Sequence, residues 1–77
     1  MSFMNEVKSV LKARNLAVVP QTMTIQQRGF AFLTEGSISA PDKVELLHEL
    51  ADIFEEEYTN IDVSLNDNLL DIKCWNA

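Results

Sequence analysis

The feature that most constrains the fold is a segment at residues 40–59 whose apolar residues fill one half of a helix. At about 100° per residue, apolar side chains lie on one half-cylinder and most acidic side chains lie on the other. The apolar half holds Val44, Leu46, Leu47, Leu50, Ala51, Ile53, Phe54 and Tyr58. Ser39 with Asp42 three residues later resembles a capping box, and Pro41 falls in the first turn, where its missing N–H is harmless. So broad an apolar face predicts a helix that packs on a β-sheet rather than in a coiled coil.

A shorter amphipathic segment, residues 3–14, predicts another helix. Its apolar side chains recur at spacings of three and four residues, as one face of a helix requires. Ser2 can cap the first turn through its hydroxyl, and Asn15 suits the left-handed residue that stops a helix. Basic residues in the last turn suit the negative end of the helix dipole.

Between these helices the chain has the features of β-strands. Residues 16–20 are apolar and predict a buried connector or a short edge strand, whereas residues 22–27 and 30–34 alternate and predict paired strands. Arg28 and Gly29 predict a turn or bulge between this pair, because glycine tolerates positive φ. The middle of the chain therefore contributes two or three strands.

The end of the chain predicts a β-hairpin whose register follows from side-chain parity. Opposed residues of an antiparallel pair must lie on the same face. A four-residue loop from Asn66 to Leu69 keeps the apolar residues together, whereas a two-residue Asn66–Asp67 loop would put Asn68 on the core face. The expected pairs are Leu65 with Leu70, Val63 with Ile72 and Ile61 with Cys74. The outward face then carries Asp62, Ser64, Asp71, Lys73 and Trp75.

Together these elements predict one α+β domain over residues 1–77, since the chain is too short for two domains. The expected order of elements is α-β-β-(β)-α-β-β. Both helices would pack on one face of a mostly antiparallel sheet of four to five strands, which gives a two-layer structure.

The chain carries 12 acidic and 6 basic residues, a net charge of −6, but the two signs are unevenly placed. Residues 1–34 hold four basic residues and one acid, or +3, whereas residues 35–77 hold two basic residues and eleven acids, or −9. This balance argues against direct binding to nucleic acid through phosphates, which needs clustered lysine and arginine. Within one domain the two segments either attract each other or present an acidic surface to a basic partner.

No secretory signal or membrane-spanning segment is expected, because the sequence lacks a basic, apolar leader and an apolar run of about 18 residues. The single cysteine, Cys74, excludes an internal disulfide framework and suits a reducing compartment, so a cytoplasmic location is expected. Its place on the core face of the hairpin favours a packing role over a nucleophilic one.

No catalytic or cofactor-binding motif is expected either. The run from His48 to Asp52 approximates the His-Glu-x-x-His pattern of zinc enzymes, but its last position is aspartate and the chain has no other histidine. The two glycines do not form a glycine-rich phosphate-binding loop. We therefore expect a protein that is not an enzyme and that holds no metal and no cofactor.

The strongest surface feature is a ladder of carboxylates on the outer face of the helix over 40–59. It comprises Glu45, Glu49, Asp52 and Glu56, joined by Glu55. Neighbours one turn apart lie about 5–6 Å apart at Cβ, so these charges repel one another and destabilise the isolated helix. The ladder is either a solvated face or a contact surface for a basic partner.

A second surface feature is apolar. If the aromatic residues of 30–34 face the helices, Ala31 and Leu33 lie on the open sheet face together with Trp75. Exposed tryptophan and aliphatic side chains on a sheet mark association surfaces, so a homodimer through this face or through an edge strand is a further hypothesis.

These features lead to a hypothesis of a non-enzymatic protein-interaction module that binds a partner protein with a basic surface. The expected contact residues are Glu45, Glu49, Asp52, Glu55, Glu56 and Trp75. A sharper version is an inhibitor, of the kind that mobile elements encode, that imitates the charge of nucleic acid. The alternative is a structural subunit that self-assembles through its sheet face, with the acidic helix serving only solubility. No binding to a membrane is expected.

Overall fold

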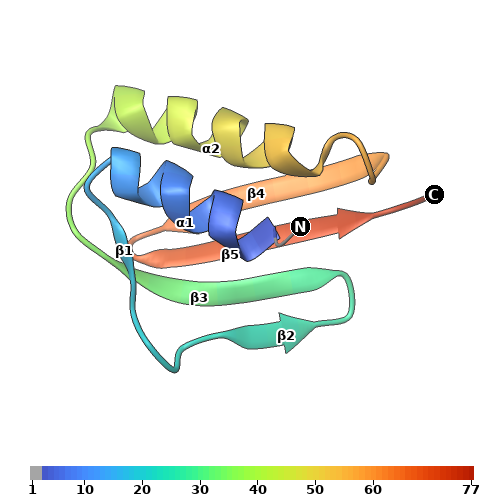
Figure 1. Ribbon diagram of the computed structural model, residues 1–77, viewed down its shortest axis with the longest axis horizontal. Helices are drawn as coiled ribbons and strands as arrows, with labels where there is room; N and C mark the ends of the chain where they lie inside the picture. The colour runs from blue at the N-terminus through green and yellow to red at the C-terminus, as the bar shows by residue number, and fades with distance from the viewer. Residues whose placement is uncertain (1–2) are drawn as a thin grey trace.

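The computed structural model describes residues 3–77, which form two helices and a five-stranded sheet (Figure 1). In chain order the elements are α1 (Phe3–Ala13), β1 (Ala17–Val18), β2 (Thr24–Gln26), β3 (Gly29–Glu35), α2 (Ala40–Phe54), β4 (Asn60–Asn66) and β5 (Leu69–Trp75). Both helices lie on one face of the sheet (Figure 1), and the strands pair antiparallel throughout. The predicted α+β architecture is therefore confirmed.

Strand β5 lies inside the sheet, between β3 and β4. Because β3 and β4 each run antiparallel to β5, they are parallel to each other, and α2 connects them across the helix-covered face (Figure 1). The short strands β1 and β2 both pair with β3. Strand β1 pairs at Thr34 and Glu35, near the end of β3, and β2 pairs at Gly29 to Ala31, near its start.

The β4–β5 hairpin has the predicted register. Leu65 pairs with Leu70, Val63 with Ile72 and Ile61 with Cys74. The ladder continues one pair further, to Asn66 and Leu69, so only Asp67 and Asn68 form the turn instead of four residues. Asp67 has a positive φ of 54°, a conformation that aspartate and asparagine adopt more readily than most residues.

The core lies between the helices and the sheet. Its largest fully buried side chains come from both helices, β3 and β5: Val7, Leu11, Leu46, Leu50, Phe54, Phe32, Leu70 and Ile72. The ring of Phe54 is central, with its centroid 5.0 Å from that of Phe3, 6.3 Å from Phe30 and 6.5 Å from Tyr58. These aromatic contacts join the end of α2 to α1 and β3.

Helix α1 stops at the predicted residue. Asn15 has a φ of 61°, and the backbone N–H of Leu16 donates to the carbonyl oxygen of Leu11 at 2.9 Å. This 6→1 hydrogen bond, with the left-handed residue before it, is the Schellman arrangement that satisfies the last carbonyls of a helix. The predicted cap at Ser2 lies outside the described residues.

Helix α2 begins as the sequence predicts. The hydroxyl oxygen of the N-cap, Ser39, accepts a hydrogen bond from the backbone N–H of Asp42 at 3.4 Å, and Pro41 lies in the first turn. The assignment of Val44 to the apolar half was wrong, since this residue is 56% exposed. Val44 lies two residues before the buried Leu46, and therefore roughly 160° around the helix from it.

Helix α2 ends at Phe54, whereas its apolar pattern predicted a helix to residue 59. Its last turn contains no basic residue, and Glu55, Glu56 and Glu57 follow directly. A longer helix would place these three negative charges at the negative end of its dipole, which explains the early end. Glu55 is instead the C-cap, and the backbone turns through the next two residues to reach β4.

Gly29 is needed for a reason different from the one predicted. The turn falls on Gln27 and Arg28, and Gly29 begins β3 without a positive φ. A Cβ at this position would lie 1.9 Å from the carbonyl oxygen of Ile72, because the backbone of β5 passes directly beside it. Glycine is required here for the close approach of two strands.

Candidate functional site

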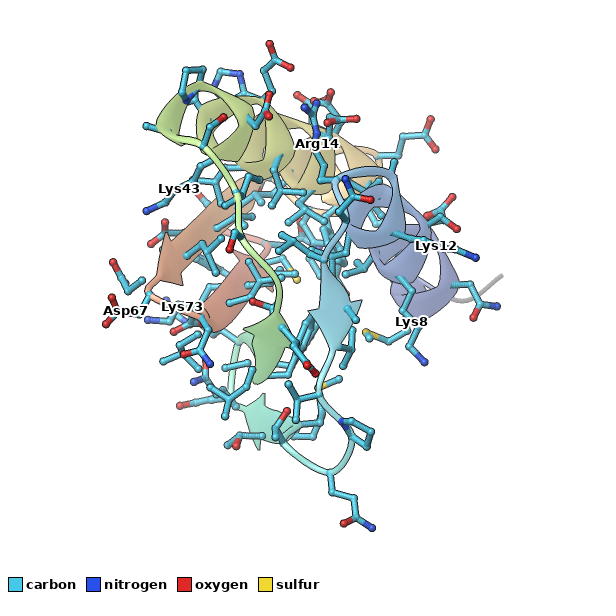
Figure 2. All side chains as sticks on the ribbon, turned by 90° about the vertical axis from the view of Figure 1, so that its left-hand side faces the viewer. Lys8, Lys12, Arg14, Lys43, Asp67 and Lys73 are labelled. Atoms are coloured by element: carbon cyan, nitrogen blue, oxygen red, sulfur yellow. The ribbon has the colours of Figure 1, made fainter. Side chains whose placement is uncertain are left out.

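Arg14 divides the acidic face of α2 into two parts. It follows the last residue of α1, and its side chain reaches the part of α2 from Asp42 to Glu49 (Figure 2). The guanidinium contacts three carboxylates: Nη1 lies 3.3 Å from Asp42 Oδ1, Nη2 lies 3.1 Å from Glu45 Oε2, and Nε lies 3.1 Å from Glu49 Oε1. Two residues of the predicted ladder, Glu45 and Glu49, therefore already have a counter-ion within the chain.

The surroundings of Arg14 keep it charged and in place. Its pKa is raised above the usual value, chiefly by the hydrogen bond to Glu49. Its side chain is only 21% exposed, whereas the three carboxylates are about half exposed. The planar guanidinium presents five N–H donors at fixed angles, so one arginine can donate to three carboxylates at once. From Asp42 to Glu49, therefore, the basic segment of the chain (residues 1–34) and the acidic segment (residues 35–77) attract each other.

Replacing Arg14 with glutamine is expected to lower the thermal unfolding midpoint at low ionic strength, because the three carboxylates then repel one another without a cation between them. The loss should shrink at about 1 M salt, where the Debye length falls to about 3 Å. Circular dichroism melts at the two salt concentrations measure this difference. Lys12→Gln is the matched control, and an equal loss in that variant would contradict the role of Arg14.

The second part of the acidic surface, which we call the acidic end, comprises Glu6 of α1 with Asp52, Glu55, Glu56 and Glu57 at the end of α2. The two helices run antiparallel, so the first turn of α1 lies beside the end of α2 (Figure 1). Glu6 is half-buried and the other four are exposed. Within residues 3–77 none of the five forms an ion pair. This end therefore carries negative charge that nothing in the described chain neutralises.

The acidic end surrounds a hollow between the two helices. It has a volume of about 340 Å³ and is lined by Phe3, Glu6, Ile53, Glu56 and Glu57. A second hollow of about 410 Å³ shares Glu6 and Ile53 with the first and extends along the helix pair to Val10. The acidic end thus combines carboxylates with an apolar floor, an arrangement that suits the aliphatic stem and charged head of a lysine or arginine.

Sequence reasoning found part of this site. It identified Asp52, Glu55 and Glu56 but placed all of them on one helix face, and it missed Glu6, Glu57 and the apolar floor. Two of the missed residues, Glu6 and Phe3 of the floor, come from α1, which tertiary packing brings to α2, and no pattern along α2 alone could reveal them. A signal for Glu57 was present in the sequence, because at about 100° per residue it falls on the apolar half of the helix while the other acidic residues of residues 44–59 fall on the opposite half.

The structure places Trp75 on the open sheet face, opposite Asn60. It is half-buried, and the guanidinium carbon of Arg28 lies 5.1 Å from the centre of its ring, in a cation–π contact. Ala31, on the same face, is only 6% exposed. Part of the apolar surface that the sequence assigned to association is thus covered by the chain itself, and Leu69 is the large apolar residue of this face that stays exposed.

The chemistry of the described residues is limited. Cys74 is half-buried beside the core, and burial raises the pKa of its thiol, which disfavours the nucleophilic thiolate. No group of three or more histidine, cysteine, aspartate or glutamate side chains within residues 3–77 is arranged to hold a metal ion. Neither described helix is long and apolar enough to cross a membrane.

The chain matches no protein-family model, no curated protein and no solved structure. Inference about its function therefore rests on its own residues and their arrangement.

Proposed function

We propose that this protein is a non-enzymatic interaction module that binds a basic segment of a partner protein at its acidic end. The observation that carries the proposal is the division made by Arg14. The acids of α2 from Asp42 to Glu49 have their counter-ion within the chain, whereas those that follow have none among residues 3–77: Asp52, Glu55, Glu56 and Glu57. A chain that neutralises one half of an acidic face and leaves the other half open presents a localised charge.

The hollow supports a protein partner over a simple cation. Its floor contains Phe3 and Ile53, so a lysine or arginine of the partner can bury its aliphatic stem there while its head meets Glu56 and Glu57. Exposed ion pairs alone contribute about 0.2–1 kcal/mol each, so affinity must come largely from this apolar contact. The carboxylates would chiefly raise the rate of encounter and select a basic partner.

The sharper form, an inhibitor that imitates a nucleic-acid backbone, has less support. Such imitation needs an extended array of free charges, and Arg14 interrupts the array at Glu45 and Glu49. Self-assembly through the sheet also has less support, because Arg28 covers part of Trp75. We place the function in the cytoplasm, since a single half-buried cysteine suits a reducing compartment.

The test is affinity capture from source cells with the tagged protein and two charge-matched variants. Glu56→Lys with Glu57→Lys is expected to abolish capture of the partner, because it reverses the charge around the hollow. Glu35→Lys with Asp62→Lys makes the same change in net charge on the sheet, and it should leave capture intact. Circular dichroism checks that both variants fold. Equal capture by the wild type and the Glu56/Glu57 variant would overturn the proposal.

A further inference from the structure

A hollow on the opposite side of α1 has the complementary charge. Its volume is about 540 Å³, and its floor is formed by Leu16, Ala17, Val18 and Pro20, which follow α1 and include β1. Lys8 and Lys12 form its rim. Figure 2 shows both lysines on the side of the molecule away from Lys43, Asp67 and Lys73. We call this feature the basic hollow.

The two lysines cannot take part in the pairing that Arg14 makes. At 3.6 residues per turn, Arg14 lies roughly 120° around the helix axis from Lys8 and roughly 160° from Lys12. Arg14 faces α2, so the lysines face away from it (Figure 2). Within residues 3–77 neither lysine forms an ion pair. These two cations are therefore free to meet the carboxylates of another molecule.

We infer that the basic hollow binds the acidic end of a second copy of this chain. The inference rests on the proposed function, since it names a partner for the same acidic end. Lys8 and Lys12 of one copy would meet Glu56 and Glu57 of the next, and half-buried Ile53 beside them would face the apolar floor of the hollow. Within one molecule, Arg14 already makes this kind of contact between α1 and α2.

The two surfaces are different, so the contact is heterologous and joins copies head to tail rather than in a closed pair. The net charge of −6 opposes association at long range. At physiological ionic strength the Debye length is about 8 Å, so this repulsion is largely screened while groups in contact still attract. The assembly is therefore weak, reversible and dependent on concentration.

Sedimentation of the full chain at physiological ionic strength tests the inference. The mean mass of the wild type should rise steadily with protein concentration, without stopping at a dimer. Lys8→Glu with Lys12→Glu blocks the basic hollow, and Glu56→Lys with Glu57→Lys blocks the acidic end. Each variant alone should associate at least about tenfold more weakly than the wild type. An equal mixture of the two should associate again, because the acidic end of the lysine variant meets the intact basic hollow of the glutamate variant, and the two reversed surfaces also carry opposite charges.

The matched control is Lys43→Glu with Lys73→Glu, which changes the net charge as much as the lysine variant does but at other positions (Figure 2). It should associate as the wild type does. A wild type that stays monomeric, or a mixture that forms no dimer, would overturn the inference. A peptide of four lysines distinguishes a failure of self-association from a failure of the proposed function. If the peptide binds the acidic end of the Lys8/Lys12 variant although the wild type stays monomeric, the self-association is wrong and the proposed function is not.

Discussion

Replacing Phe54 with alanine is expected to destabilise the protein by about 3–5 kcal/mol, the usual cost of deleting a buried phenylalanine ring. The ring is 1% exposed and contacts the rings of Phe3, Phe30 and Tyr58. No smaller side chain can maintain all three contacts, so a cavity would open where α2 meets both α1 and the sheet. The free energy of unfolding of a natural domain is about 5–15 kcal/mol, so this loss is a large part of the total.

Urea denaturation followed by circular dichroism measures this loss. Val44→Ala is the control on the same helix, because Val44 is exposed and should change the free energy of unfolding by less than about 0.5 kcal/mol. Similar midpoints for the two variants would contradict the central place of Phe54 in the core.

Replacing Gly29 with alanine is expected to cost at least about 2–3 kcal/mol, although the change adds only one methyl group. The new Cβ would lie 1.9 Å from a backbone oxygen of Ile72, and a backbone cannot rotate away as a side chain can. Strands β3 and β5 would have to separate at this point, which weakens hydrogen bonds in the middle of the sheet.

Hydrogen exchange of the β5 amides, together with urea denaturation, measures the effect of this change. Thr24→Ala on the exposed part of β2 is the control, and it should leave exchange in β5 as it is in the wild type. Protection of the β5 amides in the Gly29 variant equal to that in the wild type would contradict the close approach described above.

The sequence predicted those parts of the fold that depend on local pattern. Parity excluded every register shifted by one residue, because such a shift would move the apolar side chains of the strand to the other face. The cost of placing Asn68 on the core face then selected the register that pairs Val63 with Ile72. The end of α2 could not be found in this way. Its apolar pattern continues to Tyr58, but the accumulated charge of the glutamates after Phe54 stops the helix first.

The candidate site was predictable only in part, for a different reason. The carboxylates of α2 are visible along the sequence. Which of them are paired with a cation depends on Arg14, which lies 28 to 35 positions before its partners in the chain. An ion pair at that separation exists because the two helices pack antiparallel on one sheet. Segment charges of +3 and −9 indicated an attraction between the two regions. They did not indicate which acids it would involve.

The central claim is that Arg14 neutralises one half of the acidic face and leaves the acidic end free to bind. It is tested most directly by titrating the isotope-labelled protein with a peptide of four lysines and following its amide NMR signals. Saturable shifts are expected at Glu6 and from Ile53 to Glu57, with little change from Asp42 to Glu49. In Arg14→Gln the shifts should spread to Glu45 and Glu49. Equal shifts along the whole of α2 in the wild type would contradict the claim.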